Sequence, residues 1–450
     1  MLGGGGGGGG GKCGAPFFAP RPLRPSFSRS PLLLSAPTEP PSSSGRRGLA
    51  VLCRRAGELR RSAFGGLRRR GPGIARTAIG LRGVGTASTE DEYGEMRVDG
   101  ETFKMDEFTL ESGVKLKSPQ VRYKTFGKLN EKADNCIVVC HALTGNASVD
   151  DWWSTLLGDG KLFDTSKYFV FCANILGSCY GSTGPSSTNP ETNERYGLGF
   201  PMVTIRDSVR AHKLVLESLG VKKIQFVLGG SLGGMQSLEW ALIGKELVSK
   251  IVVIACGARH TAWQIAISEV QRASIMRDPS WENGKGQALK GLGLARQIAM
   301  ISYRSHNAYD QKFGRHLAKE MAAEVGTSDS NAAIKQGITP RFNVESYLHY
   351  QDQKFLSRFD AASYIRCTQK MDTHDVGRDR GGVEAALASL TQPALIIGFD
   401  GDLLYPLKEQ EELARLLPNA TLREVSSDAG HDAFLLEYEE IQNACADFLA

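Results

Sequence analysis

The stretch that decides the fold is residues 228–234, L-G-G-S-L-G-G. It follows a short apolar run, precedes a segment of helical period, and fits the pattern G-x-S-x-G. Between a strand and a helix, this pattern predicts a sharp turn that exposes a nucleophilic serine, here Ser231. We expect strained backbone angles at Ser231, and we expect that a Cβ at Gly229 or Gly233 would collide with the opposing backbone. Ser231 would then lie at a helix N-terminus, where free N–H groups favour a developing anion.

The segments around this turn alternate between strand-like and helix-like patterns. Strand-like runs lie at 121–126, 136–140, 168–172, 224–228, 251–255, 394–397 and 422–425, and helical segments lie at 206–219 and 234–243. Strands that alternate with helices predict a parallel sheet covered on both faces. Together with the serine turn, this order predicts an α/β protein with the α/β-hydrolase fold.

A long helical segment separates the strands at 251–255 and 394–397. It has about 130 residues with helical period and no convincing strand. Because no compact α/β unit needs so long a connection, we predict a helical insertion at about 260–390. Such insertions commonly cover a site, so we expect this one to act as a lid.

A serine nucleophile needs a base held in place by a carboxylate, and the fold predicts the chain order Ser, Asp, His. His431 fits the base, because it lies in a loop beyond the last strand and before the final helix. Asp400 and Asp402 both follow the strand at 394–397. We favour Asp402, which lies a few residues before the proline that opens the next helix, and keep Asp400 as an exposed turn residue.

The string H-A-L-T-G at 141–145 follows the strand that ends at Cys140, where this fold places half of its oxyanion hole. The backbone N–H groups of Leu143 and Leu232 are therefore the candidate donors. Each donor in such a pair contributes a factor of about 10² to 10³ in rate. His141 itself is a possible base, but its place at the strand end favours a structural role.

The first 88 residues differ from the rest in composition. They carry a net charge of about +13, which leaves about −8 on the remainder of a chain whose total is +5. They are rich in Gly, Pro, Ser and Arg, which predicts a disordered segment ahead of an enzyme domain at 89–450. This composition is typical of organellar targeting peptides, so we predict mitochondrial import. The alternatives are that this segment is a disordered linker, or an upstream region wrongly included in the coding sequence. In either case the expected location of the protein is the cytoplasm.

Other features restrict the class of protein. The basic charge belongs to the first segment, so it gives no reason to expect nucleic-acid binding by the domain. The nine cysteines are scattered without a C-x-x-C pair, which indicates a reducing compartment and no metal site. Those at 136, 140, 172 and 256 lie in apolar runs, where free thiols pack as small hydrophobic groups. No apolar run reaches the length of about 18 residues that a membrane span needs.

From about residue 109 onward, the chain resembles the homoserine O-acetyltransferases and the related serine O-acyltransferases. The matching strings are H-A-L-T-G-N (141–146), G-S-T-G-P-S-S (181–187), T-I-R-D (204–207), G-G-S-L-G-G-M-Q-S-L-E-W (229–240), V-E-S-Y-L (344–348) and G-H-D-A-F-L (430–435). The resemblance implies transfer of an acetyl group from acetyl-CoA, through an acyl-serine, to the hydroxyl of homoserine in amino-acid biosynthesis. It implies no permanently bound cofactor, small-molecule substrates and a homodimer.

The resemblance also implies an acceptor site. Arg296 would hold the carboxylate of the amino acid and Asp432 its ammonium, which matches one cation and one anion to a zwitterion. The alternative for Arg296 is a solvated arginine on a helix surface, since Arg304 lies nearby in a similar helix. The alternative for Asp432 is an aspartate that caps a helix.

Some strings depart from the family pattern. Residues 176–181 read L-G-S-C-Y-G instead of the more usual L-G-G-C form, Asn146 and Ser148 replace an acidic residue and a histidine, and C-G-A-R-H at 256–260 is similar to serine-acylating members. Serine as acceptor and succinyl as acyl group are therefore alternatives. An esterase or thioesterase with the same triad is a second alternative, and a non-catalytic binding protein is a third.

Overall fold

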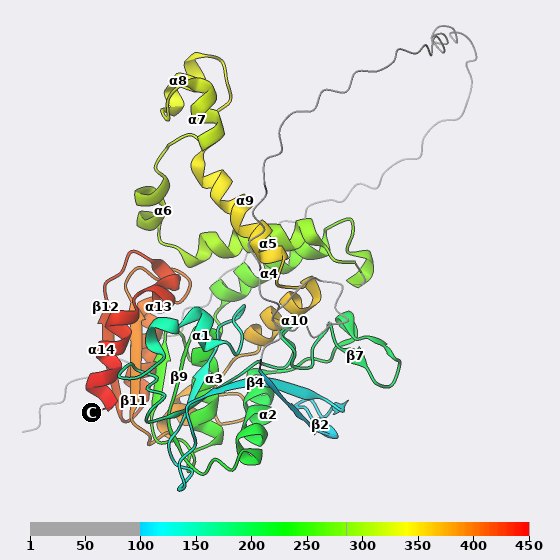
Figure 1. The fold of residues 1–450 in the computed structure, drawn as a ribbon, viewed down its shortest axis with the longest axis vertical. Coiled ribbons are helices and arrows are strands. Elements are labelled where there is room, and N and C mark those ends of the chain that lie inside the picture. Colours follow the sequence, from blue (N-terminus) through cyan, green and yellow to red (C-terminus); the bar gives the residue numbers. More distant parts are fainter. Residues whose placement is uncertain (1–99, 285, 450) are drawn as a thin grey trace, which may run out of the picture. The chain divides into compact units, whose positions relative to one another are not determined.

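The computed structural model describes residues 100–449 except Lys285. The basic segment predicted at 1–88 lies outside the described residues. An eight-stranded sheet forms the centre of the described part, in the order β1-β4-β6-β5-β9-β10-β11-β12 (Figure 1). In this order, the strands are Glu101–Lys104, Gln120–Phe126, Phe169–Ala173, Cys136–Cys140, Ile224–Gly230, Ile251–Ile254, Ala394–Phe399 and Ala420–Val425.

The sheet is mixed, which refines the prediction of a parallel sheet. The six strands from β6 to β12 run parallel, whereas β4 pairs antiparallel with both β1 and β6. The parallel strands β5, β6, β10 and β11 are buried along their whole length, as their continuous apolar runs predict. The antiparallel strand β4 is buried only in part, which agrees with its alternating pattern.

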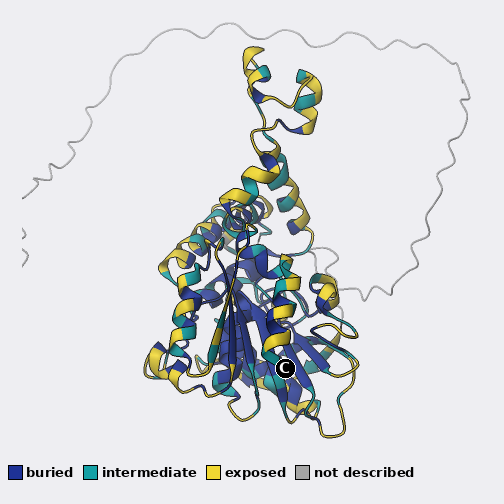
Figure 2. Cartoon of the chain, turned by 90° about the vertical axis from the view of Figure 1, so that its left-hand side faces the viewer, coloured by how far each residue is buried: buried dark blue, intermediate teal, exposed yellow. Residues whose placement is uncertain are grey.

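Helices cover both faces of this sheet. On β5, Val138 packs into the same apolar cluster as residues of α2 (Ile205–Ser218) and α3 (Leu232–Ile243). The neighbouring Ile137 and Val139 belong to a second cluster with residues of α14 (Tyr438–Leu449). This alternation follows from the two-residue period of a strand, and Figure 2 shows the buried strands between helices whose outer faces are exposed.

The string T-I-R-D at 204–207 forms the beginning of α2. The Thr204 hydroxyl accepts a hydrogen bond from the N–H of Asp207 (3.1 Å), and the Asp207 carboxylate accepts one from the N–H of Thr204 (3.1 Å). This reciprocal pair is a capping box, which supplies partners for two N–H groups that the helix leaves free. The string therefore has a structural role.

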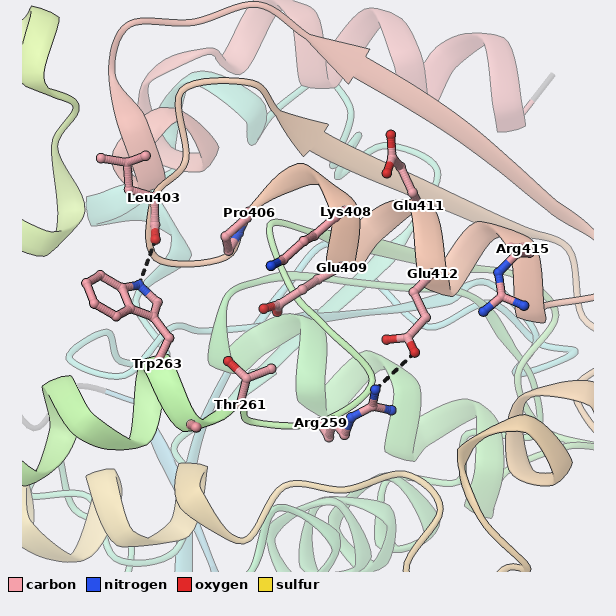
Figure 3. A pocket seen from close by; sticks show the side chains of 11 residues that line it. Arg259, Thr261, Trp263, Leu403, Pro406, Lys408, Glu409, Glu411, Glu412 and Arg415 are labelled. Atoms are coloured by element: carbon pink, nitrogen blue, oxygen red, sulfur yellow. Dashed lines mark hydrogen bonds and ion pairs between the residues drawn. The ribbon is translucent and has the colours of Figure 1, made fainter. Parts of the chain in front are cut away.

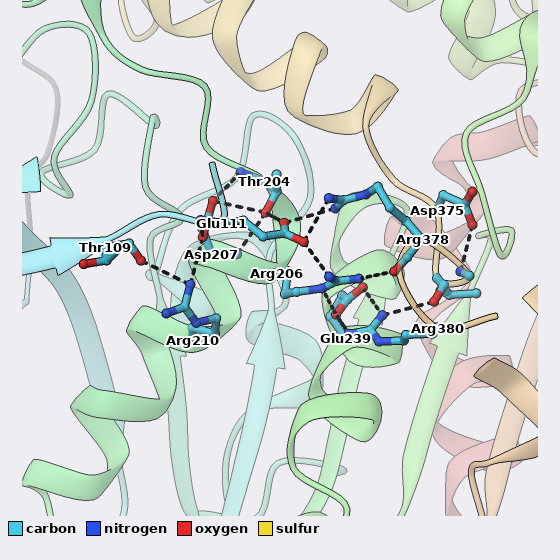
Figure 4. A network of polar contacts seen from close by, with 12 residues as sticks. Thr109, Glu111, Thr204, Arg206, Asp207, Arg210, Glu239, Asp375, Arg378 and Arg380 are labelled. Atoms are coloured by element: carbon cyan, nitrogen blue, oxygen red, sulfur yellow. Dashed lines mark hydrogen bonds and ion pairs between the residues drawn. The ribbon is translucent and has the colours of Figure 1, made fainter. Parts of the chain in front are cut away.

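A network of ion pairs ties this region to the loop that follows α10 (Ala361–Asp372) (Figure 4). Glu111 accepts hydrogen bonds from Arg206 and from Arg378 (2.9 and 3.1 Å). Arg380 donates to both oxygens of Glu239 on α3 (2.8 and 2.7 Å). Bidentate pairs of this kind fix orientation as well as distance, so the network joins the start of the domain to the end of the insertion.

The segment between β10 and β11 is a helical insertion, as predicted. Its helices are α4 (Ala262–Met276), α5 (Leu289–Tyr303), α6 (His306–Phe313), α7 (Lys319–Val325), α8 (Ser330–Lys335), α9 (Asn343–Leu356), α10 and α11 (Val383–Ala388). The described residues of this insertion, which exclude residue 285, contain no strand. Helices α4 and α5 pack against each other and α9 packs on α5, and Figure 1 shows α7 and α8 at the far end of α9 from the sheet.

The cysteines of residues 100–449 are all free and buried, and those at 136, 140, 172 and 256 pack in the core as predicted. Within this part of the chain, no helix is long and apolar enough to cross a membrane. The same residues contain no group of three or more side chains arranged to hold a metal ion.

Candidate active site

The predicted serine turn lies between β9 and α3. Ser231 has φ 58° and ψ −123°, a strained conformation for a residue with a side chain. A Cβ on Gly229 would lie 2.4 Å from the carbonyl of Gly233, and a Cβ on Gly233 would lie 2.2 Å from the carbonyl oxygen of Cys140. The strain at Ser231 and the need for glycine on both sides of it are thus confirmed.

The structure brings Asp402 and His431 into direct contact. The Oδ2 atom of Asp402 lies 2.7 Å from Nδ1 of His431. Its Oδ1 atom accepts hydrogen bonds from the N–H groups of Leu404 and Tyr405, both at 2.8 Å. The two residues are 2% and 3% exposed. Because backbone groups hold one carboxylate oxygen, the other faces the imidazole, keeps its proton on Nδ1 and leaves Nε2 to act as a base.

Asp400 has different partners. Its carboxylate accepts hydrogen bonds from the Ser426 hydroxyl (2.7 Å) and the Ser427 N–H (3.0 Å). These bonds lower the pKa of an exposed Asp400. The structure therefore pairs His431 with Asp402 and leaves Asp400 at the surface, as the sequence indicated.

Aromatic rings hold the His431 imidazole in place. The ring of Tyr405 stacks on it with centroids 5.0 Å apart, and the rings of Phe434 and Tyr303 lie at 5.3 and 5.9 Å. Tyr303 ends α5, so the helical insertion supplies part of this cage. An imidazole fixed on several sides keeps the orientation that proton transfer needs.

Ser231 and His431 line one cavity of about 600 Å³. Leu143, Arg296 and Asp432 line the same cavity, so the side chains that the sequence assigned to nucleophile, base and acceptor site meet in one place. The volume lies within the usual range for sites that bind small molecules.

A larger surface hollow of about 900 Å³ borders the loop that follows Asp402 (Figure 3). Its lining includes Trp263 and Leu403 but neither Ser231 nor His431. Several of its polar groups bind each other: the Trp263 Nε1–H donates to the Leu403 carbonyl (2.8 Å), and Arg259 pairs with Glu412 (3.0 Å). We therefore take the smaller cavity as the candidate active site.

The loop at 141–145, here called the oxyanion loop, carries one predicted oxyanion donor. Leu143 lines the cavity. The second predicted donor, Leu232, is the first residue of α3, so its N–H has no partner within the helix.

His141 is fully buried behind the oxyanion loop. Its Nε2 accepts from the N–H of Ile175 (3.2 Å), so the ring proton is on Nδ1 and is donated to the Ala142 carbonyl (2.8 Å). Burial lowers the pKa of His141 to about 4, which keeps the ring neutral. These contacts confirm the structural role that we favoured over that of a base.

Three arginines of the insertion, at positions 296, 304 and 358, lie around the cavity, and their partners differ. Arg304 pairs with Asp432 (2.9 Å), and Arg358 donates to the Thr144 carbonyl (2.7 Å). The buried Nε of Arg296 has no hydrogen-bond partner among the described residues. Its guanidinium lies over the rings of Phe355 (5.0 Å) and Tyr303 (5.9 Å). Arg296 is therefore no solvated surface arginine, but a half-buried group packed against aromatic rings.

Asp432 already has a cationic neighbour, which the sequence did not reveal. Burial raises the pKa of its carboxyl, and the Arg304 guanidinium acts against that rise. Asp432 precedes the short helix α13 (Ala433–Leu436), but its side chain makes no capping hydrogen bond there. The helix-cap alternative is therefore wrong.

Sequence reasoning missed several residues of the cavity lining, among them Tyr180 and Arg358. Arg358 follows α9, and its Nη1 also lies 2.6 Å from the hydroxyl of Tyr180, far away in the sequence. No spacing rule links the two positions. Position 180 did fall within a string that departs from the family pattern, and this was the one available signal.

Comparisons with known proteins define the class of protein to which this chain belongs. A sequence model of the alpha/beta hydrolase fold matches residues 135–438, so this is an α/β-hydrolase-fold protein, as its sheet order and serine turn indicate. The chain is 45% identical over 358 residues to a homoserine O-acetyltransferase of Salinibacter ruber, which covers 78% of this chain and 97% of that relative. It belongs to the homoserine O-acetyltransferase family of acyltransferases, which confirms the resemblance read from its motifs.

Solved structures share the fold. A homoserine O-acetyltransferase from Bacillus anthracis matches with a TM-score of 0.70 and 25% identity, over 78% of this chain and 96% of that one. Esterase E22 matches with a TM-score of 0.69 and 25% identity, over 78% and 99%. Because proteins named as transferase and as esterase superpose equally well, the fold does not distinguish these activities.

Proposed function

We propose that this protein transfers an acetyl group from acetyl-CoA to the hydroxyl of L-homoserine, as a step of amino-acid biosynthesis. The observation that carries the proposal is the buried Nε of Arg296, which has no hydrogen-bond partner among the described residues and belongs to a side chain that lines the same cavity as Ser231 and His431. A plain esterase has no use for a buried cation reserved for a carboxylate. The names of the curated relatives support the same acceptor.

The first half-reaction acylates the enzyme. Nε2 of His431 takes the proton of the Ser231 hydroxyl while Oγ attacks the thioester carbonyl of acetyl-CoA. The N–H groups of Leu143 and Leu232 hold the resulting oxyanion. As the carbon–sulfur bond breaks, His431 returns the proton to the leaving thiolate, and CoA leaves an acetyl-serine behind. The buried Asp402 stabilises the imidazolium that forms between the two proton transfers.

The second half-reaction releases the product. His431 takes the proton of the homoserine hydroxyl, whose oxygen attacks the acetyl-serine carbonyl. The same two N–H groups hold the second oxyanion, and the proton returns to Ser231 Oγ as O-acetylhomoserine departs. No cofactor is needed beyond acetyl-CoA as co-substrate.

The acceptor is held at both ends. Arg296 supplies a planar fork for the carboxylate, and Phe355 and Tyr303 keep the fork in place. Asp432 binds the ammonium while it stays paired with Arg304, since a carboxylate can accept from two cations through its two oxygens. The insertion that contributes Arg296 acts as a lid, which keeps water from the acetyl-serine so that transfer outruns hydrolysis.

A competition assay tests this function. Free CoA and acylated products are measured with acetyl-CoA or succinyl-CoA as donor, and with homoserine, serine and water as competing acceptors. We expect O-acetylhomoserine as the main product. A chain that releases acetate at the same rate with and without amino acids would be an esterase or thioesterase, and preference for serine or for succinyl-CoA would assign the family alternatives.

We also propose that the chain forms a homodimer through the outer face of α4 and α5, where Val270, Leu294 and Ile301 are 55%, 49% and 57% exposed. Analytical ultracentrifugation of the wild type and of Leu294→Glu/Ile301→Glu tests this assembly, with a monomeric wild type as the contrary result.

For the first 88 residues we propose mitochondrial import, which their fusion to a fluorescent protein would test. A diffuse cytoplasmic signal would favour the alternative location.

A further inference from the structure

The oxyanion loop is held from two sides by two different parts of the chain. From the core, His141 Nδ1–H donates to the Ala142 carbonyl, which also accepts from the Gly145 N–H (2.9 Å). Leu143 and Thr144 are therefore the two central residues of a turn. The Ala142 carbonyl belongs to the same peptide plane as the Leu143 N–H, so fixing its oxygen constrains the direction of the proposed oxyanion donor.

From the opposite side, Arg358 reaches the loop from the insertion. Its Nη1 donates to the Thr144 carbonyl (2.7 Å) and to the Tyr180 hydroxyl (2.6 Å). Its guanidinium lies 5.1 Å from the ring of Phe355, and the guanidinium of Arg296 lies 5.0 Å from the same ring. Arg358 is half-buried, and a charge-assisted hydrogen bond in such a place is stronger than one between neutral groups.

We propose that Arg358 is a positioning residue through which the seating of the insertion completes the oxyanion hole. His141 fixes the Ala142–Leu143 peptide, which begins the turn. Arg358 fixes the carbonyl of Thr144, at the other end of the turn. With the insertion displaced, the second contact is lost and the Thr144–Gly145 peptide can rotate, so the turn that presents the Leu143 N–H is held from the core alone and its direction is less well fixed. The inference rests on the proposed nucleophile Ser231, but it does not depend on which amino acid is the acceptor.

The same residue could instead bind substrate, because Arg358 lines the cavity and carries a charge. Its hydrogen bonds argue against this role: Nη1 already has two acceptors in the protein, whereas the Nε of Arg296 has none among the described residues. A small uncharged acyl donor separates the two roles. Acylation of Ser231 by p-nitrophenyl acetate needs the oxyanion hole, but it offers neither a carboxylate nor a phosphate for an arginine to bind.

The experiment measures the burst of p-nitrophenolate from the wild type, Arg358→Met and Arg358→Ala. We expect the acylation rate constant to fall by about 10- to 100-fold in both variants, less than the loss of an entire oxyanion donor. Added methylguanidinium should restore part of the rate in Arg358→Ala. Arg315→Met is the matched control, because Arg315 lies in the insertion with its guanidinium 5.1 Å from the ring of Phe342 and is absent from the cavity lining. Its burst should equal that of the wild type.

Three results would overturn the inference. A wild-type burst in Arg358→Met, with only a raised KM for acetyl-CoA or homoserine, would make Arg358 a binding residue. A slow burst that methylguanidinium does not restore, together with a lowered Tm, would make its role one of general stability. A wild type without a Ser231-dependent burst would refute the proposed nucleophile and this inference with it. Failure of homoserine as acceptor would contradict the proposed function alone.

Discussion

Replacement of Arg296 by methionine separates the two half-reactions. Acylation of Ser231 by acetyl-CoA requires no amino acid, so Arg296→Met should still release a burst of CoA equal to one per active site. The variant should then stall, because the acceptor's carboxylate has lost its partner. Methionine keeps contact with the rings of Phe355 and Tyr303, so the change removes the charge and retains much of the packing.

The size of the effect follows from the surroundings of Arg296. Its Nε is buried and its guanidinium lies over aromatic rings, so the contact with a carboxylate would be desolvated. Loss of one partner from a desolvated charge pair costs about 2 to 5 kcal/mol. At 1.4 kcal/mol per tenfold change, we expect the kcat/KM for homoserine to fall by about 30- to 4,000-fold.

Rapid-quench kinetics and mass spectrometry of the intact protein would measure the burst and the acetyl-serine that accumulates. The expected product is acetylated enzyme that loses its acetyl group slowly to water. Loss of the burst together with an unchanged KM for homoserine would refute the reasoning, because Arg296 would then belong to the acetyl-CoA site.

Three further predictions concern the acid, the core histidines and the first segment. Asp402→Asn should lower kcat by about 10⁴-fold, whereas Asp400→Asn should have little effect in the same steady-state assay; the opposite ranking would reassign the acid. Burial lowers the pKa of His141 to about 4 and that of His212 to about 3, so the unfolded chain binds more protons below pH 6.5. The free energy of unfolding should therefore fall as the pH drops from about 6.5 to 4, by up to about 1.4 kcal/mol per pH unit for each histidine, and urea unfolding of His212→Gln should show a weaker dependence. A chain that begins at Thr89 should unfold cooperatively and keep full activity; loss of either in thermal melts or the transferase assay would show that the first segment is structural.

The sequence predicted the parts of the site that depend on local pattern. The turn at Ser231 needs glycines at fixed positions and a strand and helix on either side, and all of these are visible over a dozen residues. The choice of Asp402 over Asp400 rested on the nearby proline, and the structure confirms the pairing with His431. Apolar runs likewise indicated the buried parallel strands and the helical insertion.

Contacts between distant segments could not be predicted. Arg304 pairs with Asp432 and Arg358 binds Thr144, but each pair is separated by more than a hundred residues and follows no periodic rule. The antiparallel pairing of β4 was missed because strand direction depends on the path of the connections. The string T-I-R-D was noted as a family feature, although its Thr–Asp spacing already fits a capping box.

The insertion enters the fold between β10 and β11, after the strand that carries Ser231 and before the strand that leads to Asp402. The proposed catalytic triad therefore belongs to the sheet and its loops, while Arg296, the proposed partner of the acceptor's carboxylate, belongs to a segment that begins and ends between two neighbouring strands. Such an arrangement lets evolution alter the acceptor without altering the catalytic groups. A lineage could therefore reshape the insertion while it keeps its triad, and proteins named as an esterase and as an acetyltransferase do share this fold.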